Sequence, residues 1–296
     1  MRERERTRTP VRSGGVRRGV GIIAWSAVAC LLLPSVSTAA ALAGGSTRDE
    51  EGFDMRETIA ALREANYAAD GEAVARLLGE LRAAAEDPQQ PERFRAHFQA
   101  GTASTLLASF VGPGSLANPQ GDVPLMLRHM REAADSFEAC IALAPGYADA
   151  HIALAGNYGM RSGVEPERAA ELLGKSSAAR ARALSLGARN PRVVAGEAGY
   201  LFWAPPEAGG NRDRALARYR EALALFAAEP AEESALHAWG EADVWAFLAM
   251  AHFALDPPDA GAAKAAVERA LALRPDFAWA RGYLLPRVER ALRAAP

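Results

Sequence analysis

The side chains capable of acid–base, nucleophilic or metal chemistry are few and isolated in this sequence of 296 residues. Cys140 is the only cysteine besides Cys30, and the five histidines stand singly. Such chemistry needs grouped residues, as in His-Glu-x-x-His, paired cysteines, a glycine-rich phosphate loop or Gly-x-Ser-x-Gly, and these motifs are absent. We therefore predict no catalytic, cofactor-binding or metal-binding residues. The histidines are His97, His129, His151, His237 and His252.

The first 43 residues have the composition of a secretory signal peptide. Residues 1–19 hold seven arginines against two glutamates, Val20–Leu33 is an apolar run, and small residues follow as far as Ala43. A basic start, a short apolar run and an Ala-x-Ala site are typical of such leaders. The apolar run is shorter than the about 20 residues that span a bilayer. We predict cleavage near Ala43, a flexible linker over residues 44–52, and a periplasmic or secreted protein.

Alternatives to ordinary cleavage stay open at the leader. Arg17-Arg18 resembles a twin-arginine export signal, Cys30 lies in a loose likeness of a lipoprotein cleavage box, and an uncleaved leader would act as an anchor. Loss of residues 1–43 removes seven arginines and two glutamates, which shifts the formal net charge from −2 to −7. A mildly acidic chain lacks the clustered basic face of nucleic-acid binders, and no other apolar run is long enough to cross a membrane. We expect no nucleic-acid partner and no stable membrane span after signal cleavage.

The rest of the chain is rich in alanine, leucine, glutamate and arginine, which favours an all-α fold. No segment shows the sustained period-two alternation of a β-strand. Proline, glycine, asparagine and aspartate punctuate the apolar periodicity and mark where helices end. The pattern predicts helices over residues 54–69, 72–85, 91–110, 124–143, 148–160, 166–186, 191–203, 213–227, 240–255, 259–273 and 277–294.

Small and large apolar residues alternate at helical spacing in several aligned segments. Small residues let two helices approach closely, and the large residue three or four places away fills the gap between them. The aligned segments are Ala133…Phe137…Cys140-Ile141-x-Leu143-x-Pro145, Ala215…Tyr219…Ala222-Leu223-x-Leu225, Ala263…Val267…Ala270-Leu271-x-Leu273-x-Pro275, and the first-helix pair His151…Leu154-Ala155…Tyr158 and Trp245…Leu248-Ala249…His252.

This pattern resembles the tetratricopeptide repeat (TPR) family, best over residues 125–294. The resemblance implies an all-α solenoid of helical hairpins over residues 53–296, with an N-terminal helical hairpin and a C-terminal capping helix. Such units stack because one hairpin cannot bury its apolar face alone. The unit lengths are unequal, with insertions at 187–190 and 227–239, which predicts one fixed domain rather than a regular superhelix.

The resemblance also gives His151, His252 and Cys140 places in the helix packing. His151 and His252 occupy aromatic positions of the repeat, and Cys140 occupies a small apolar position. We expect packed imidazoles and a buried, inert thiol.

The resemblance implies that first helices line a concave face. In the best-matched units this face is expected to carry Asp149, Ile152, Met160, Met250 and Phe253, together with small residues. Some family members clamp a terminal carboxylate with a Lys/Asn/Arg set, which this face lacks. A hydrophobic peptide or helix, or a domain of the protein itself, suits such a face better than an acidic tail. The small or further residues expected there are Gly156, Gly159, Asp243 and Ala246.

Two features depart from the repeat pattern. A Pro-Pro…Gly-Gly loop runs from Pro205 to Asn211 after Trp203, and its glycines permit a close approach to the backbone. Either a neighbouring helix or a ligand could make that approach. Trp239 and Trp279 lie near helix starts beside turns, where we expect partial exposure, and exposed tryptophans often anchor partners.

We therefore predict an exported, non-catalytic module that binds a protein or peptide partner in the cell envelope. The alternative is a small-molecule or lipid-binding accessory subunit of a solute-uptake system, which predicts a closed apolar pocket. An enzyme would need a convergent cluster of titratable groups. The candidate partner-binding residues are Asp149, Ile152, Met160, Trp203, Trp239, Met250, Phe253 and Trp279.

Overall fold

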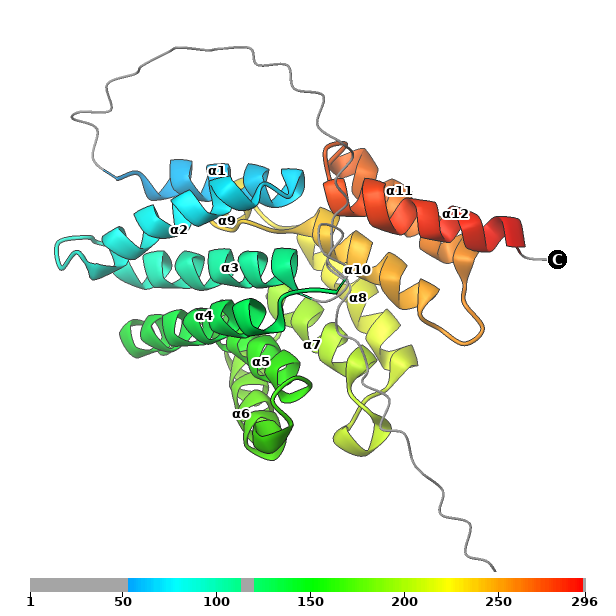
Figure 1. Ribbon diagram of the computed structural model, residues 1–296, viewed down its shortest axis with the longest axis horizontal. Helices are drawn as coiled ribbons and strands as arrows, with labels where there is room; N and C mark the ends of the chain where they lie inside the picture. Colours follow the sequence, from blue (N-terminus) through cyan, green and yellow to red (C-terminus); the bar gives the residue numbers. More distant parts are fainter. Residues whose placement is uncertain (1–52, 113–119, 295–296) are drawn as a thin grey trace, which may run out of the picture.

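The computed structural model describes residues 53–112 and 120–294. The signal peptide expected over residues 1–43 and the linker expected over 44–52 lie outside this part of the chain. All regular elements of the described residues are helical (Figure 1), which confirms the predicted all-α fold.

The first half of the domain begins with a helical hairpin, as predicted. Most helix ends in this half differ from the predicted ones by one or two residues. A 3₁₀ turn, η1, precedes α6. The elements are α1 (Met55–Ala68), α2 (Gly71–Glu86), α3 (Arg93–Val111), α4 (Val123–Leu143), α5 (Ala148–Ser162), η1 (Pro166–Arg168) and α6 (Ala169–Leu186).

The second half adds two irregular features. A single helical turn, α9, interrupts the insertion at 227–239, and the C-terminal helix opens with a π-helical turn, η3. The elements are α7 (Pro191–Trp203), η2 (Pro206–Ala208), α8 (Arg212–Phe226), α9 (Ala231–Ser234), α10 (Glu241–Phe253), α11 (Ala260–Leu273), η3 (Ala280–Leu284) and α12 (Leu285–Ala294).

Aspartate and asparagine side chains determine where many of these helices begin. The Asn190 side chain accepts hydrogen bonds from the backbone N–H groups of Arg192 (2.8 Å) and Val193 (3.4 Å). Pro191 suits the first helical position because it has no N–H group that would need an acceptor. Asn211 caps α8 by accepting from Arg214 N at 2.9 Å. Asp54, Asp70, Asp122 and Asp259 cap α1, α2, α4 and α11 in the same way.

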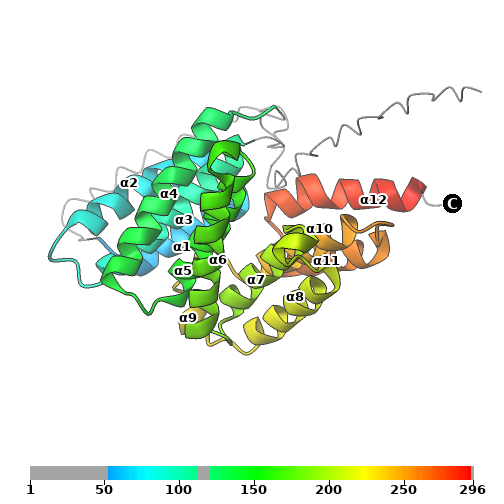
Figure 2. The ribbon, with the colours of Figure 1, turned by 90° about the horizontal axis from the view of Figure 1, so that it is seen from below.

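Successive helices pack against one another in chain order (Figures 1 and 2). In Figure 2, α12 runs along one edge beside α10 and α11. Helix α3 has no polar face because α2, α4 and the 229–239 segment all cover it. Its polar side chains Gln99, Thr102 and Ser104 are buried.

The two ends of the helix stack meet. Tyr67 of α1 lies in the apolar core of the C-terminal helices, while Ala238 lies in the core of α1, α2 and α3. The Tyr67 hydroxyl donates to Asp243 Oδ2 at 2.6 Å, and its ring packs edge-on against Phe277. Arg274 pairs with Glu64 at 2.6 Å. These contacts join α1 to α10 and to the turn after α11, so the stack is closed on itself.

The Tyr67–Asp243 contact predicts a measurable pH dependence. Burial raises the pKa of Asp243, although hydrogen bonds from Tyr67 and from the Gly240 N–H oppose this. The native state therefore holds this proton more tightly than the unfolded chain, whose aspartate pKa is about 3.9. The favourable contribution to folding is present at low pH and is lost as pH rises through the native pKa.

We compare the free energy of unfolding of the wild type with that of Asp243→Asn. The difference, wild type minus variant, should fall as pH rises from about 4 and then level off. Its slope should be at most about 1.4 kcal/mol per pH unit. Urea unfolding of both proteins at a series of pH values measures this difference. A difference that stays constant or grows with pH would contradict the assignment.

Close helix packing makes a second prediction at Gly101. A Cβ atom there would lie 2.5 Å from Cε1 of the buried Phe137 ring, where α3 meets α4. Gly101→Ala should therefore lower the free energy of unfolding by about 1–3 kcal/mol through overpacking. Gly174→Ala is the matched control, because Gly174 is an exposed helical glycine whose Cβ would meet nothing within 4 Å. The control should gain about 0.5–1 kcal/mol, and equal effects at both sites would refute the packing argument.

Candidate functional site

The inner face of the solenoid is occupied by the protein's own chain. The insertion at 227–239 leaves α8 and lies against side chains of α1, α3 and α7. Arg63 donates to the carbonyl oxygens of Ser234 (2.7 Å) and His237 (2.6 and 2.9 Å), and Gln99 donates to that of Leu236 at 2.9 Å. We call residues 229–239 the inner segment. The occupant is thus a short segment of the same chain, and not a whole domain of the protein as we expected.

Asp149 and Ile152, which we expected on the concave face, are buried in the contacts between α5 and α7 and so are not open to a partner. Asp149 is buried, and its Oδ2 accepts from Asn190 Nδ2 at 2.8 Å, which ties α5 to the start of α7. Burial raises the pKa of Asp149, while Arg192 and Asn190 oppose this rise. Ile152 packs on the α7 backbone, since a Cβ on Gly196 would lie 2.3 Å from Ile152 Cγ1.

The two tryptophans expected to be partly exposed differ: Trp239 is partly exposed as expected, and Trp279 is not. Trp279 is 2 % exposed, packed against Phe247 and Phe277, so the expectation of partial exposure is wrong for it. Trp239 is partly buried and packs on Phe226, with the Arg192 guanidinium 5.9 Å from its ring centroid. Trp279 therefore packs within the C-terminal helices, and Trp239 packs between the inner segment and α8.

The Pro205–Asn211 loop makes its close approach to its own helix. A Cβ on Gly210 would lie 1.8 Å from the Ala204 carbonyl oxygen, and Gly209 has a φ of 88°. Tyr200 donates its hydroxyl proton to the Ala208 oxygen at 2.5 Å. These contacts explain both glycines without a ligand.

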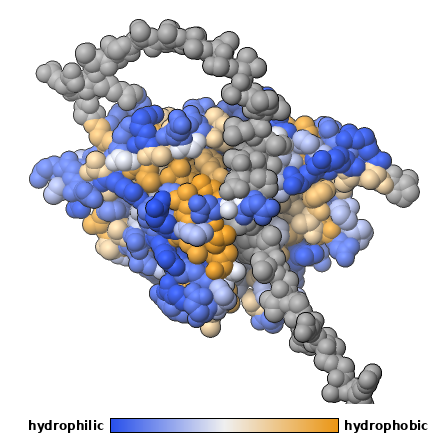
Figure 3. All heavy atoms as spheres, in the orientation of Figure 1, coloured by the Kyte–Doolittle hydropathy of each residue, from blue (hydrophilic) through white to orange (hydrophobic). Residues whose placement is uncertain are grey.

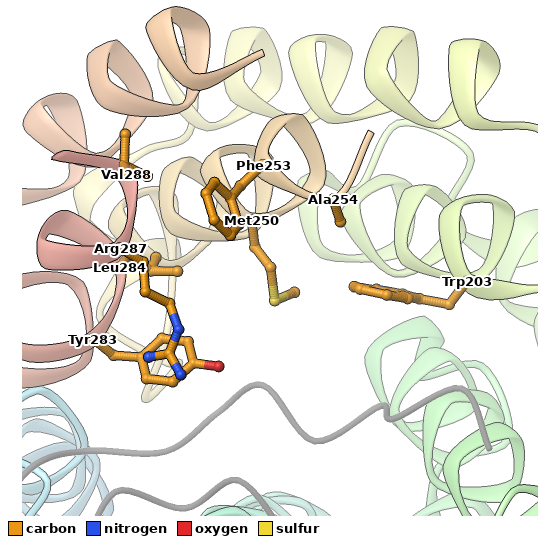
Figure 4. Close-up of a pocket in the computed structure, with 8 residues that line it drawn as sticks. All are labelled: Trp203, Met250, Phe253, Ala254, Tyr283, Leu284, Arg287 and Val288. Carbon is orange, nitrogen blue, oxygen red and sulfur yellow. The ribbon is translucent and has the colours of Figure 1, made fainter. Parts of the chain in front are cut away.

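Three of the four remaining predicted residues come together at one place. Trp203 of α7 and Met250 and Phe253 of α10 line a pocket of about 150 Å³. Figure 4 shows the Trp203 ring and the Met250 thioether facing each other across it, with Tyr283 and Arg287 on the opposite wall. Met160 is partly buried near the end of α5 and is not part of this wall. The other lining residues are Ala254, Leu284 and Val288.

The π-helical turn η3 shapes the C-terminal wall. Trp279, Tyr283 and Arg287 follow one another at four-residue spacing, with the first two rings stacked and the guanidinium carbon of Arg287 3.5 Å from the Tyr283 ring centroid. π-Helical turns occur frequently at functional sites. Tyr283, Leu284, Arg287 and Val288 were missing from the sequence prediction. The Trp-x₃-Tyr-x₃-Arg spacing was the signal that could have revealed them.

The pocket is apolar with a cationic side. In the part of the chain that the structure describes, no carboxylate pairs with Arg287, and Arg290 on the same helix is exposed. The face shown in Figure 3 carries its clearest apolar area left of the centre, on the side of the N-terminal helices, among hydrophilic atoms. The pocket therefore presents hydrophobic, aromatic and positively charged groups to a ligand.

The groups capable of chemistry are packed apart from this pocket. Burial raises the pKa of Cys140 to about 12, so its reactive thiolate is not populated at neutral pH. His151 Nε2 lies 3.0 Å from the Pro145 oxygen, and His252 is buried beside Asp259. Residues 53–112 and 120–294 contain no cluster of three or more potential metal ligands, and none of their helices is long and apolar enough to cross a bilayer.

Comparison with solved structures identifies the architecture. A thermophilic TPR protein of Thermus thermophilus superimposes with a TM-score of 0.51 at 18 % sequence identity, over 81 % of this chain and 100 % of that chain. This chain has the tetratricopeptide-repeat fold. The predicted TPR-like solenoid is therefore confirmed. No family model and no curated protein match the sequence.

Proposed function

We propose that this TPR protein is an exported, non-catalytic scaffold that binds a protein or peptide partner in the cell envelope. The observation that carries the proposal is the pocket between α7, α10 and α12, which unites Trp203, Met250 and Phe253 with Tyr283 and Arg287. Aromatic residues, methionine and arginine are the types enriched at the centres of protein interfaces. We name this surface the α12 pocket.

The size of the α12 pocket favours a side-chain anchor. Its volume of about 150 Å³ is below the roughly 300–1,000 Å³ typical of sites that enclose a small molecule. One bulky apolar side chain of a partner fits such a space, as a hot-spot residue does at an interface. Arg287 at the wall adds a preference for a carboxylate next to that anchor.

Export rests on the leader sequence. The arginine-rich start, the apolar run Val20–Leu33 and the site at Ala43 support secretion to the periplasm or the medium. The TPR fold supports protein binding because stacked hairpins offer extended surfaces.

The test is a comparison of α12 pocket variants. Phe253→Ala and Arg287→Glu should each weaken binding of a partner purified from envelope extract at least about tenfold, which is about 1.4 kcal/mol. Quantitative mass spectrometry of captured proteins finds the partner, and titration of the purified pair measures the dissociation constant.

Leu173→Ala is the matched control, because Leu173 is exposed on α6, outside the α12 pocket. Its partner affinity should equal that of the wild type. Circular dichroism checks that all three variants stay helical. A partner that binds every variant equally well would exclude the α12 pocket as the docking site.

A second hollow favours the accessory-subunit alternative, although it is open and flanked by arginines and not the closed apolar pocket that we expected. It lies between α8, α10 and α11, measures about 340 Å³, and is lined by Trp245, Leu248 and His252 with Arg220 and Arg269 at its sides. Its size and two guanidinium groups suit a small organic anion. Native mass spectrometry of protein purified from its own host should then show a bound species that Arg269→Glu loses. Protein free of ligand would leave this alternative without support.

A further inference from the structure

The inner face of the solenoid binds backbone, not only side chains. Arg63 of α1 contacts two carbonyl oxygens of the inner segment, and Gln99 of α3 contacts a third. Asn66 donates to the Ala238 oxygen at 3.4 Å. Recognition of successive carbonyl groups by side-chain donors is how a groove can hold a peptide with little regard to its sequence.

Two residues of the inner segment contact the inner face through their side chains. Glu229 forms a bidentate pair with Arg192 at 2.5 and 3.1 Å, and both side chains are nearly inaccessible to solvent. A buried arginine of this kind is costly unless a carboxylate meets it. Glu229 is therefore a required residue of the segment.

His237 is the second such position. Its side chain is 1 % exposed and its ring meets Phe98 edge-on, with centroids 6.1 Å apart. Its Nε2 is 3.5 Å from Glu233 Oε1, and neither ring nitrogen has a hydrogen-bond partner among the described residues. Burial, reinforced by Arg192, Arg95 and Arg63, lowers the pKa of His237 to about 2, so the imidazole is neutral and packs as an aromatic ring.

Several residues between Glu229 and His237 have exposed side chains, unlike those two residues. Ala231, Glu232 and Glu233 are exposed. Their helical turn, α9, spans the distance between Glu229 and the carbonyl groups that Arg63 holds. Since no described residue pairs with Glu232, that position is free to vary.

From these contacts we infer that the inner face is a peptide-binding groove, and that its ligand is the chain's own inner segment, recognised as an acidic residue and a histidine eight positions apart with backbone capture between and beside them. The groove and the segment are complementary surfaces. We therefore expect the groove to bind the segment when the segment is supplied as a separate peptide. This inference concerns a different surface from the α12 pocket.

The experiment uses the full chain with residues 229–238 replaced by a glycine–serine linker of equal length. A synthetic peptide of residues 229–238 carries a fluorophore and is titrated with this variant. We expect saturable binding to the variant and none to the wild type, whose groove is filled. In the peptide, Glu229→Ala or His237→Ala should weaken binding at least about tenfold, because each leaves Arg192 or the Phe98 site without its partner.

Glu232→Ala in the peptide is the matched control and should bind like the original sequence. Absence of binding, or equal losses for Glu229→Ala and Glu232→Ala, would overturn the inference. Phe253→Ala and Arg287→Glu placed in the linker variant should leave peptide binding unchanged. This separates the groove from the α12 pocket, so that either proposal can fail without the other.

Hydrogen exchange gives a second test that does not require the linker variant to fold. In the otherwise intact chain, Arg63→Gln should speed exchange of the amides of Ser234, Leu236 and His237 at least about tenfold, because it frees the carbonyls that hold the segment. Arg56→Gln, an exposed change on the same helix, is the control. Exchange that is unchanged by Arg63→Gln would show that the groove does not retain the segment.

Discussion

The arrangement of this protein depends on the hydrogen bonds from the Arg63 guanidinium group to the backbone of the inner segment. Arg63 lies on the first helix, yet it holds carbonyl oxygens more than 170 positions away in the chain. With Tyr67 and Glu64, the same helix reaches Asp243 and Arg274. A stack of hairpins bound only to their neighbours is open-ended and deforms easily. Here the first helix closes the stack, so that the inner segment is enclosed by helices from both halves.

This closure accounts for the distribution of charge inside the protein. Three arginines, Arg63, Arg95 and Arg192, face the region around His237, and such groups are unfavourable in an interior without acceptors. The inner segment supplies acceptors for two of them, as backbone carbonyl groups for Arg63 and the Glu229 carboxylate for Arg192, while Arg95 pairs with Glu92 at 3.1 Å. The insertion therefore satisfies the polar inner face, and a TPR of equal unit lengths would lack it.

Local sequence was a good guide to the helices and a poor one to the face they enclose. Asn190-Pro191 predicted the first residue of α7, and the small–large alternation predicted the pairing of Ala133 and Phe137 with neighbouring helices, because caps and packing periodicity are properties of adjacent residues. The path of residues 227–239 depends on donors from α1 and α3, which no periodic pattern records. The burial of Asp149 depends on Asn190, which is distant in sequence, and that of Trp279 on Phe247 of α10 as well as on its neighbours Phe277 and Tyr283.

Because the inner segment occupies the inner face, the surface available to a partner lies elsewhere, at the α12 pocket. Trp203, Met250 and Phe253 were expected on a concave groove or beside a loop, and the structure gathers them instead against Tyr283 and Arg287 of the C-terminal helix. The π-helical turn matters here because an extra residue in the turn shifts the side chains that follow it around the helix axis. Arg287 is then stacked on Tyr283, and no carboxylate within residues 53–112 or 120–294 pairs with it. The C-terminal capping helix, which covers the last repeat, thus forms one wall of the α12 pocket. The contacts that pack this helix against α10 therefore also shape the surface on which we propose that a partner docks.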